Sequence, residues 1–129
     1  MKPYDPLKPP EPGAWQSLDE QERLDLVEEF HRRARVRLPN AKVHAVLHVI
    51  VENQIALGDE IPVKRTVERL MSEGLDRHDS IHAVGSVFIG HINDLLGRAE
   101  AEPEARADAN ADYYLALAQL TAKDWLQSG

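Results

Sequence analysis

The feature that most constrains this chain is a set of histidines at four-residue spacing. His44, His48 and Glu52 follow one another at intervals of four, and His78 and His82 repeat that interval further along the chain. Residues four apart lie on the same face of an α-helix, one turn above each other. Each histidine pair can therefore direct two imidazoles to one point in space. The spacing predicts two helices that face each other across a pocket of four histidines.

A metal ion explains this grouping better than chance does. With six histidines in 129 residues, random placement would give about 0.2 pairs at this spacing. Several imidazoles in one core need a partner for every ring nitrogen, and an ion satisfies them together. In the competing interpretation, neutral histidines hydrogen-bond to carboxylates such as Asp79 and hold the helices in register. The pattern favours the metal site.

Helix geometry limits which of these residues can share one ion. At about 1.5 Å of rise per residue, His44 and Glu52 lie about 12 Å apart along the helix axis, so they cannot both bind it directly. In one arrangement His44 and His48 join His78 and His82, and Glu52 orients a ligand, acts as a general base or binds a neighbouring ion. In the other, His48 and Glu52 join the second pair. The sequence leaves both arrangements open.

The other two histidines are interpreted from the faces of their helices. His31 lies on the apolar stripe that Val27, Phe30 and Ala34 form on the preceding helix. A lone histidine there is more often a core residue bonded to a neighbour, although its direction also suits a further metal ligand. His91 points away from the apolar face of its helix, so we expect it at the surface.

The absence of cysteine restricts the kind of ion. With no cysteine in the chain, any metal is bound by nitrogen and oxygen, which favours zinc, iron or nickel over magnesium and calcium. A ferritin-type pair of irons needs more inward glutamates than the sequence offers. An ion with an open position would permit hydrolysis or lyase chemistry, and a closed site would be structural. Whether the protein is an enzyme stays open.

Composition predicts a single cytoplasmic domain. A chain of 129 residues suits one domain. The net charge of −7 disfavours sequence-independent binding to nucleic acid, which depends on Lys and Arg. The apolar runs are too short to cross a membrane, and the N-terminus lacks the apolar core of a signal peptide.

The residue pattern predicts an all-α protein, a bundle of four longer helices and one short helix behind an extended arm. Residues 1–14 contain five prolines and form the predicted arm, and residues 15–129 form the bundle. A capping-box pattern, Ser17-Leu18-Asp19-Glu20, starts the first helix. The predicted helices span residues 17–38, 41–57, 62–73 and 76–98, and a last helix begins at Pro103.

The aromatic residues suggest a partner. Tyr113, Tyr114 and Trp125 give the last helix the largest aromatic surface of the chain. We therefore expect a homodimer that uses this helix and the Pro-rich arm. The functional alternative to a metal-dependent enzyme or a metal or redox sensor is a metal-free interaction module that acts as such a homodimer.

The histidine framework also resembles a known family. The pattern is Asn40-x3-His44-x3-His48-x3-Glu52-x-Gln54, then Asp59 with Pro62, His78-x3-His82-Ala83-Val84, and finally Tyr114 with Leu117 and Leu120. It is similar to that of a bacterial family of small proteins classified as a domain of unknown function, over roughly residues 40–126. The resemblance implies an all-helical bacterial cytosolic protein and carries no established activity. The chain departs from the family pattern in its short N-terminal region and at Arg77 and Ile81, where acidic residues would be expected.

Overall fold

The computed structural model describes residues 3–34, 41–101 and 109–128. Over these residues the chain is helical and has no strand, which confirms the predicted all-α bundle. The helices are α1 (Pro12–Ser17), α2 (Glu20–Arg33), α3 (Ala41–Ala56), α4 (Val63–Ser72), α5 (Arg77–Ala101), α6 (Ala109–Gln119) and α7 (Ala122–Ser128), with a 3₁₀-helix, η1 (Gly58–Glu60), between α3 and α4. None of the described helices combines the length and the apolarity that crossing a bilayer requires.

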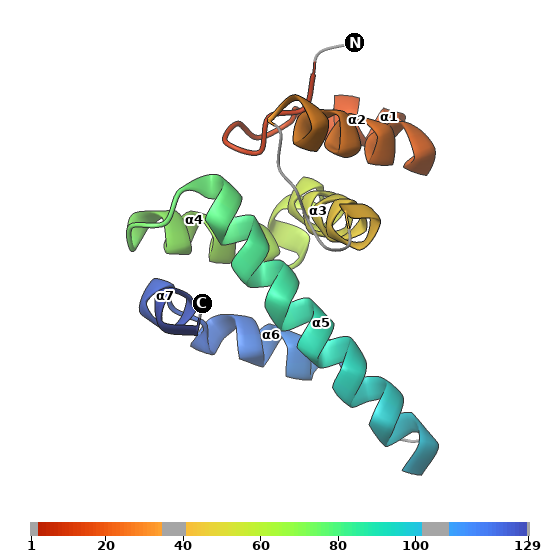
Figure 1. The fold of residues 1–129 in the computed structure, drawn as a ribbon. Coiled ribbons are helices and arrows are strands. Elements are labelled where there is room, and N and C mark those ends of the chain that lie inside the picture. The colour runs from red at the N-terminus through yellow and green to blue at the C-terminus, as the bar shows by residue number, and fades with distance from the viewer. Residues whose placement is uncertain (1–2, 35–40, 102–108, 129) are drawn as a thin grey trace.

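Helix α3 joins two hydrophobic cores. It packs against α1 and α2 on one side and against α4 and α5 on the other, and α5 runs diagonally across the molecule (Figure 1). The N-terminal core consists of buried residues from the arm and the first three helices, namely Tyr4, Trp15, Val27, Ala45 and Val49. The C-terminal core consists of residues from α3 to α7, namely Val51, Val63, Val67, Leu70, Leu75, Ile81, Ala83, Val84, Tyr113, Leu117 and Ala122. The facing surfaces of α2, α3 and α5 thus lie at the junction of the two cores.

The start of the bundle differs from the prediction. Helix α1 begins at Pro12, inside the stretch expected to be extended, because proline at the first helical position costs no hydrogen bond. The Glu11 carboxylate caps this helix by accepting from the backbone N–H groups of Gly13 and Ala14. Ser17 ends α1, so the predicted capping box at Ser17 is wrong. The cap of α2 is Asp19, which forms a capping box with Glu22.

The arm preceding α1 lies on the N-terminal core. Tyr4 and Pro6 are buried, whereas Leu7 is exposed. The Tyr4 ring lies 5.9 Å from the ring of Trp15 and 6.1 Å from that of Phe30, measured between centroids. The arm therefore contributes a buried aromatic residue to the core.

The later helix ends follow their local signals only in part. Gly58 and Gly74 adopt positive φ angles of 67° and 112° after α3 and α4, as expected for glycines that terminate helices. The single last helix that was predicted is two helices, because Thr121 interrupts it and its hydroxyl accepts the N–H of Asp124 at the start of α7. Tyr113 is buried in the C-terminal core and so does not add to an aromatic surface. The predicted end of the first helix, near Leu38, and the predicted start of the last helix, at Pro103, lie outside the described residues.

Candidate metal centre

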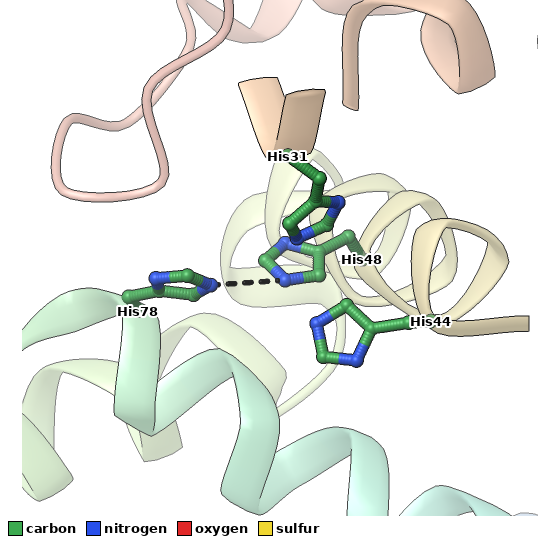
Figure 2. A group of neighbouring side chains, drawn as sticks. All are labelled: His31, His44, His48 and His78. Carbon is green, nitrogen blue, oxygen red and sulfur yellow. Dashed lines mark hydrogen bonds between the residues drawn. The ribbon is translucent and has the colours of Figure 1, made fainter. Parts of the chain in front are cut away.

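Five histidines from three helices form one cluster, with His48 at its centre. His31 comes from α2, His44 and His48 from α3, and His78 and His82 from α5. The His48 ring centroid lies 5.1 Å from that of His31, 5.0 Å from His44, 4.9 Å from His78 and 5.0 Å from His82. Figure 2 shows four of these rings turned toward one another, with His31 reaching in from α2. We call this group the histidine cluster.

The two histidine pairs at four-residue spacing face each other. Ring centroids are 5.0 Å apart within the α3 pair, 4.3 Å apart within the α5 pair, and 4.5 Å apart between His44 and His82. His48 Nε2 lies 3.0 Å from His82 Nε2 and 3.2 Å from His78 Nε2. In a tetrahedral zinc site with Zn–N bonds of about 2.0–2.1 Å, neighbouring nitrogens lie roughly 3.3–3.4 Å apart. These separations suit either an N–H···N hydrogen bond or a shared ion.

His31 completes a group of converging ligand atoms. One ring nitrogen from each of His31, His44, His48 and His78 lies within 4.8 Å of the others, so these four histidines could hold a metal ion. His31 is 5% exposed, and neither of its ring nitrogens has a hydrogen-bond partner. The sequence favoured a core histidine bonded to a neighbour, and that expectation is wrong. The nearest rings are those of His44 at 4.8 Å and His48 at 5.1 Å, and neither hydrogen-bonds to His31. Leaving a buried polar group unpaired costs roughly 1–3 kcal/mol.

Burial keeps the cluster in the form that binds metals. Burial, with a smaller contribution from neighbouring imidazoles, lowers the pKa of His31 and His82 to about 4 and that of His48 to about 2. The pKa values of His44 and His78 are also lowered, mainly by burial. The rings are therefore neutral near pH 7, and neutral imidazole is the metal ligand.

Glu52 lies beside the cluster, and other side chains hold both of its oxygens. It is 2% exposed. Arg77 donates from Nη2 to Oε1 at 2.7 Å and from Nη1 to Oε2 at 2.8 Å, and the Tyr4 hydroxyl donates to Oε2 at 2.7 Å. The same hydroxyl lies 3.1 Å from His48 Nδ1. Among the described residues, the group of converging ligand atoms does not include a Glu52 oxygen.

The residues around Glu52 stabilise one another's protonation states. Burial alone would lower the pKa of Arg77, but the hydrogen bonds and negative charge of Glu52 outweigh it and raise that pKa. Burial, followed by the charge of Glu52, raises the pKa of Tyr4 well above its usual value. Tyr4 thus keeps its proton and Arg77 its charge. We call Tyr4, Glu52 and Arg77 the Glu52 group.

Sequence reasoning missed the roles of Tyr4 and Arg77. Tyr4 belongs to the arm and meets His48 and Glu52 across more than forty residues of chain, so no local pattern connects them. Arg77 carried a weak signal: it departs from the acidic pattern of the resembled family and directly precedes His78. The buried carboxylate of Glu52 opposite Arg77 explains an arginine beside this histidine pair.

A pocket of about 190 Å³ adjoins the cluster between α3, α5 and α7. His44, His48 and His82 form its polar wall. The other lining residues carry no formal charge and are mostly apolar, namely Leu47, Ile81, Gly85, Ser86, Ile89 and Trp125. An ion held by the cluster would therefore have one side that a small molecule can approach.

His91 does not join the cluster. Its ring stacks on Tyr113 with centroids 5.5 Å apart, on the other half of α5. It is half-buried there rather than a fully exposed surface residue.

Comparisons with protein-family models, with curated proteins and with solved structures each find no match. The candidate metal centre therefore rests on the geometry of the histidine cluster, and the family resemblance stays a prediction.

Proposed function

We propose that this protein binds a divalent transition-metal ion in the histidine cluster and acts as a metal-dependent protein. The observation that carries the proposal is His31, whose two ring nitrogens are buried without a partner among four other imidazoles. Such a cost is hard to explain in a metal-free core, whereas an ion gives the ring a partner. Nitrogen ligation without cysteine suits zinc, iron or nickel.

The proposed ligands are the histidines common to two groups of four: the converging group and the group predicted from the spacing. His44, His48 and His78 belong to the converging group and to the set predicted from spacing, and His31 and His82 stand on either side of them as the fourth ligand or as a fourth and a fifth. All five are neutral, so a bound ion would keep its full charge and act as a strong Lewis acid. The engaged oxygens of Glu52 support a role in orienting His48 over roles as ligand or general base.

The adjoining pocket favours activity over a purely structural ion. A structural site surrounds its ion with protein ligands, whereas a catalytic or sensing site keeps one position for water or substrate. The pocket reaches three of the histidines and carries no charged side chain. It supports a small, neutral and largely apolar substrate or signal molecule for a metal-dependent enzyme or sensor.

Elemental analysis of protein purified without an affinity tag tests the metal site. We expect close to one ion per chain, either as purified or after addition of zinc, ferrous iron or nickel. His48→Asn should lose it, whereas His91→Asn, which removes an imidazole outside the cluster, should retain it. Less than about a tenth of an ion per chain, with no uptake on addition, would exclude the site. The metal-free interaction module, in which the 3.0 Å contact of His48 with His82 is a plain hydrogen bond, would then replace it.

The open position is tested separately in protein loaded with cobalt(II). Added imidazole should change the visible spectrum if it enters the pocket and coordinates the ion. An unchanged spectrum at saturating imidazole would indicate a closed, structural site.

A further inference from the structure

The Tyr4 hydroxyl lies between Glu52 and His48, and its single proton decides how the two are connected. A hydroxyl has one hydrogen to donate and two lone pairs to accept with. Its shorter contact, 2.7 Å, goes to the carboxylate oxygen Oε2 of Glu52, which can only accept. Toward His48 Nδ1, at 3.1 Å, the Tyr4 oxygen is therefore the acceptor. The proton of that second bond belongs to His48.

This assignment fixes the tautomer of His48. A neutral imidazole carries one N–H, so a ring protonated at Nδ1 has a free lone pair at Nε2. In this structure Nε2 is the nitrogen that faces His78 and His82, at 3.2 and 3.0 Å. Metal-binding histidines characteristically donate their other N–H to an oxygen acceptor, which orients the ring and raises its basicity. Tyr4 offers that acceptor to His48.

The arm that carries Tyr4 is held at a second point. Arg77 Nη1 donates to the backbone oxygen of Pro6 at 2.9 Å while it also donates to Glu52. Tyr4, Glu52 and Arg77 are each at most 5% exposed. Arg77 thus positions the carboxylate, the carboxylate positions the hydroxyl, and the docked arm places both beside His48.

We infer that the N-terminal arm is part of the metal centre, with Tyr4 as a positioning residue that holds His48 in its metal-binding tautomer. This inference rests on the proposed metal site. Because the bound ion requires the lone pair on Nε2, it also requires the N–H on Nδ1 that Tyr4 accepts. Metal binding and docking of the arm then favour each other by the same factor.

Two tyrosine variants provide the test. Tyr4→Phe removes the hydroxyl that accepts from His48. Tyr113→Phe is the matched control, because Tyr113 is 4% exposed and its hydroxyl donates to another α3 side chain, Gln54, at 2.7 Å. We expect Tyr4→Phe to weaken zinc binding about 10- to 100-fold in competition with a chromophoric chelator. Tyr113→Phe should bind zinc as the wild type does.

Nitrogen-15 NMR reads the tautomer directly. In the metal-free wild type, the ring signals of His48 should show the proton on Nδ1. In Tyr4→Phe they should shift toward the Nε2–H form. A general loss of packing would also favour the Nε2–H form, so the backbone amide signals outside the arm must stay at their wild-type positions for the shift to report positioning by Tyr4.

Hydrogen exchange in the wild type supplies a measurement that needs no variant. The amides of Leu7 and Lys8 bond within the arm to Asp5. Zinc should slow their exchange more than it slows that of amides in α6, which does not line the pocket beside the cluster. Equal slowing in both segments would overturn the coupling.

The outcomes distinguish this inference from the proposed function. A wild type that takes up no metal overturns both. A wild type that binds zinc, with Tyr4→Phe binding equally well, overturns only the role of Tyr4. If Tyr4→Phe does not fold, the inference is tested on the wild type by the tautomer of His48 and by the exchange of the arm amides. A proton on Nε2 of His48 would overturn it.

Discussion

Two groups of buried polar side chains lie next to each other between α3 and α5, and they differ in how well their partners match. In the Glu52 group, the carboxylate oxygens, the guanidinium and the hydroxyl bond to one another. In the histidine cluster, His31 has no partner for either ring nitrogen. Among the described residues, those two nitrogens are the buried side-chain polar atoms without a hydrogen bond. The first group satisfies its own polar atoms, whereas the second leaves two buried ring nitrogens without a partner.

The two groups should affect different properties of the protein. A complete buried ion pair is costly to break, because removing one partner leaves the other charge buried. Replacing an unpaired imidazole of the histidine cluster should cost the metal-free protein little stability, because that imidazole is buried without a hydrogen bond. The Glu52 group should therefore affect folding most, and the histidine cluster should affect metal binding most.

The largest effect is expected from Arg77→Met. It leaves the Glu52 carboxylate buried without its cation, and the free energy of unfolding should fall by about 3–5 kcal/mol in urea denaturation. Arg32→Met is the control, since Arg32 pairs with Glu29 at the surface with side chains 73% and 48% exposed, and should cost less than about 1 kcal/mol. Equal effects of the two changes would remove the basis of the comparison.

Metal addition should give the next largest effect. An ion that binds only the folded state, at a free concentration of about 100 times its Kd, should raise the free energy of unfolding by about 2.7 kcal/mol. Thermal denaturation should show the gain, and a chelator should reverse it. His48→Asn should show no gain. Stabilisation of His48→Asn equal to that of the wild type would place the ion outside the cluster.

Acid should destabilise the metal-free protein. The unfolded chain protonates its histidines near pH 6.5, whereas burial lowers the folded-state pKa of His31 and His82 to about 4 and of His48 to about 2. The unfolded state thus binds more protons as the pH falls, so stability present above pH 6.5 is lost toward pH 4. Between pH 7 and 6 the loss should be about 0.7 kcal/mol per ring, or about 2 kcal/mol for the three. Urea denaturation of His31→Leu should show this loss reduced by about 0.7 kcal/mol, the contribution of one ring.

The smallest effect on folding is expected from His31→Leu in the metal-free protein. It replaces an unpaired buried imidazole with an apolar side chain, so stability should stay within about 1 kcal/mol of the wild type or rise. His48→Leu should cost more, because it removes a bonded partner of Tyr4. Metal affinity should fall in both variants. A large loss of stability in His31→Leu would mean that this ring has a structural role in the metal-free core.

The parts of the site that depend on helix periodicity could be predicted from the sequence. The spacing of His44 with His48 and of His78 with His82 placed each pair on one helix face, because side-chain direction repeats within one element. The position of His31 on an apolar stripe gave its inward direction in the same way. An apolar stripe does not show whether a buried histidine ring has a hydrogen-bond partner. That depends on which helices pack against the ring.

The remaining parts depend on contacts between distant segments. Tyr4 reaches Glu52 because an irregular, proline-rich arm docks on the N-terminal core. Side-chain direction does not repeat regularly along such a backbone, so the sequence pattern does not predict the contact. Helix α1 was missed because the density of prolines outweighed the favourable position of Pro12. The pocket was not predictable either, since it needs Trp125 from α7 to lie opposite the histidines.

The docked arm has a consequence for the order in which the protein is made. Tyr4 leaves the ribosome before every residue that it positions, and Arg77, which holds the arm, emerges only as α5 begins. Until then the arm lacks the hydrogen bond that Arg77 donates to Pro6. All five clustered histidines are synthesised before α6 and α7. The residues of the proposed metal centre are thus all translated while the segment that contributes the outer wall of its pocket has yet to be made.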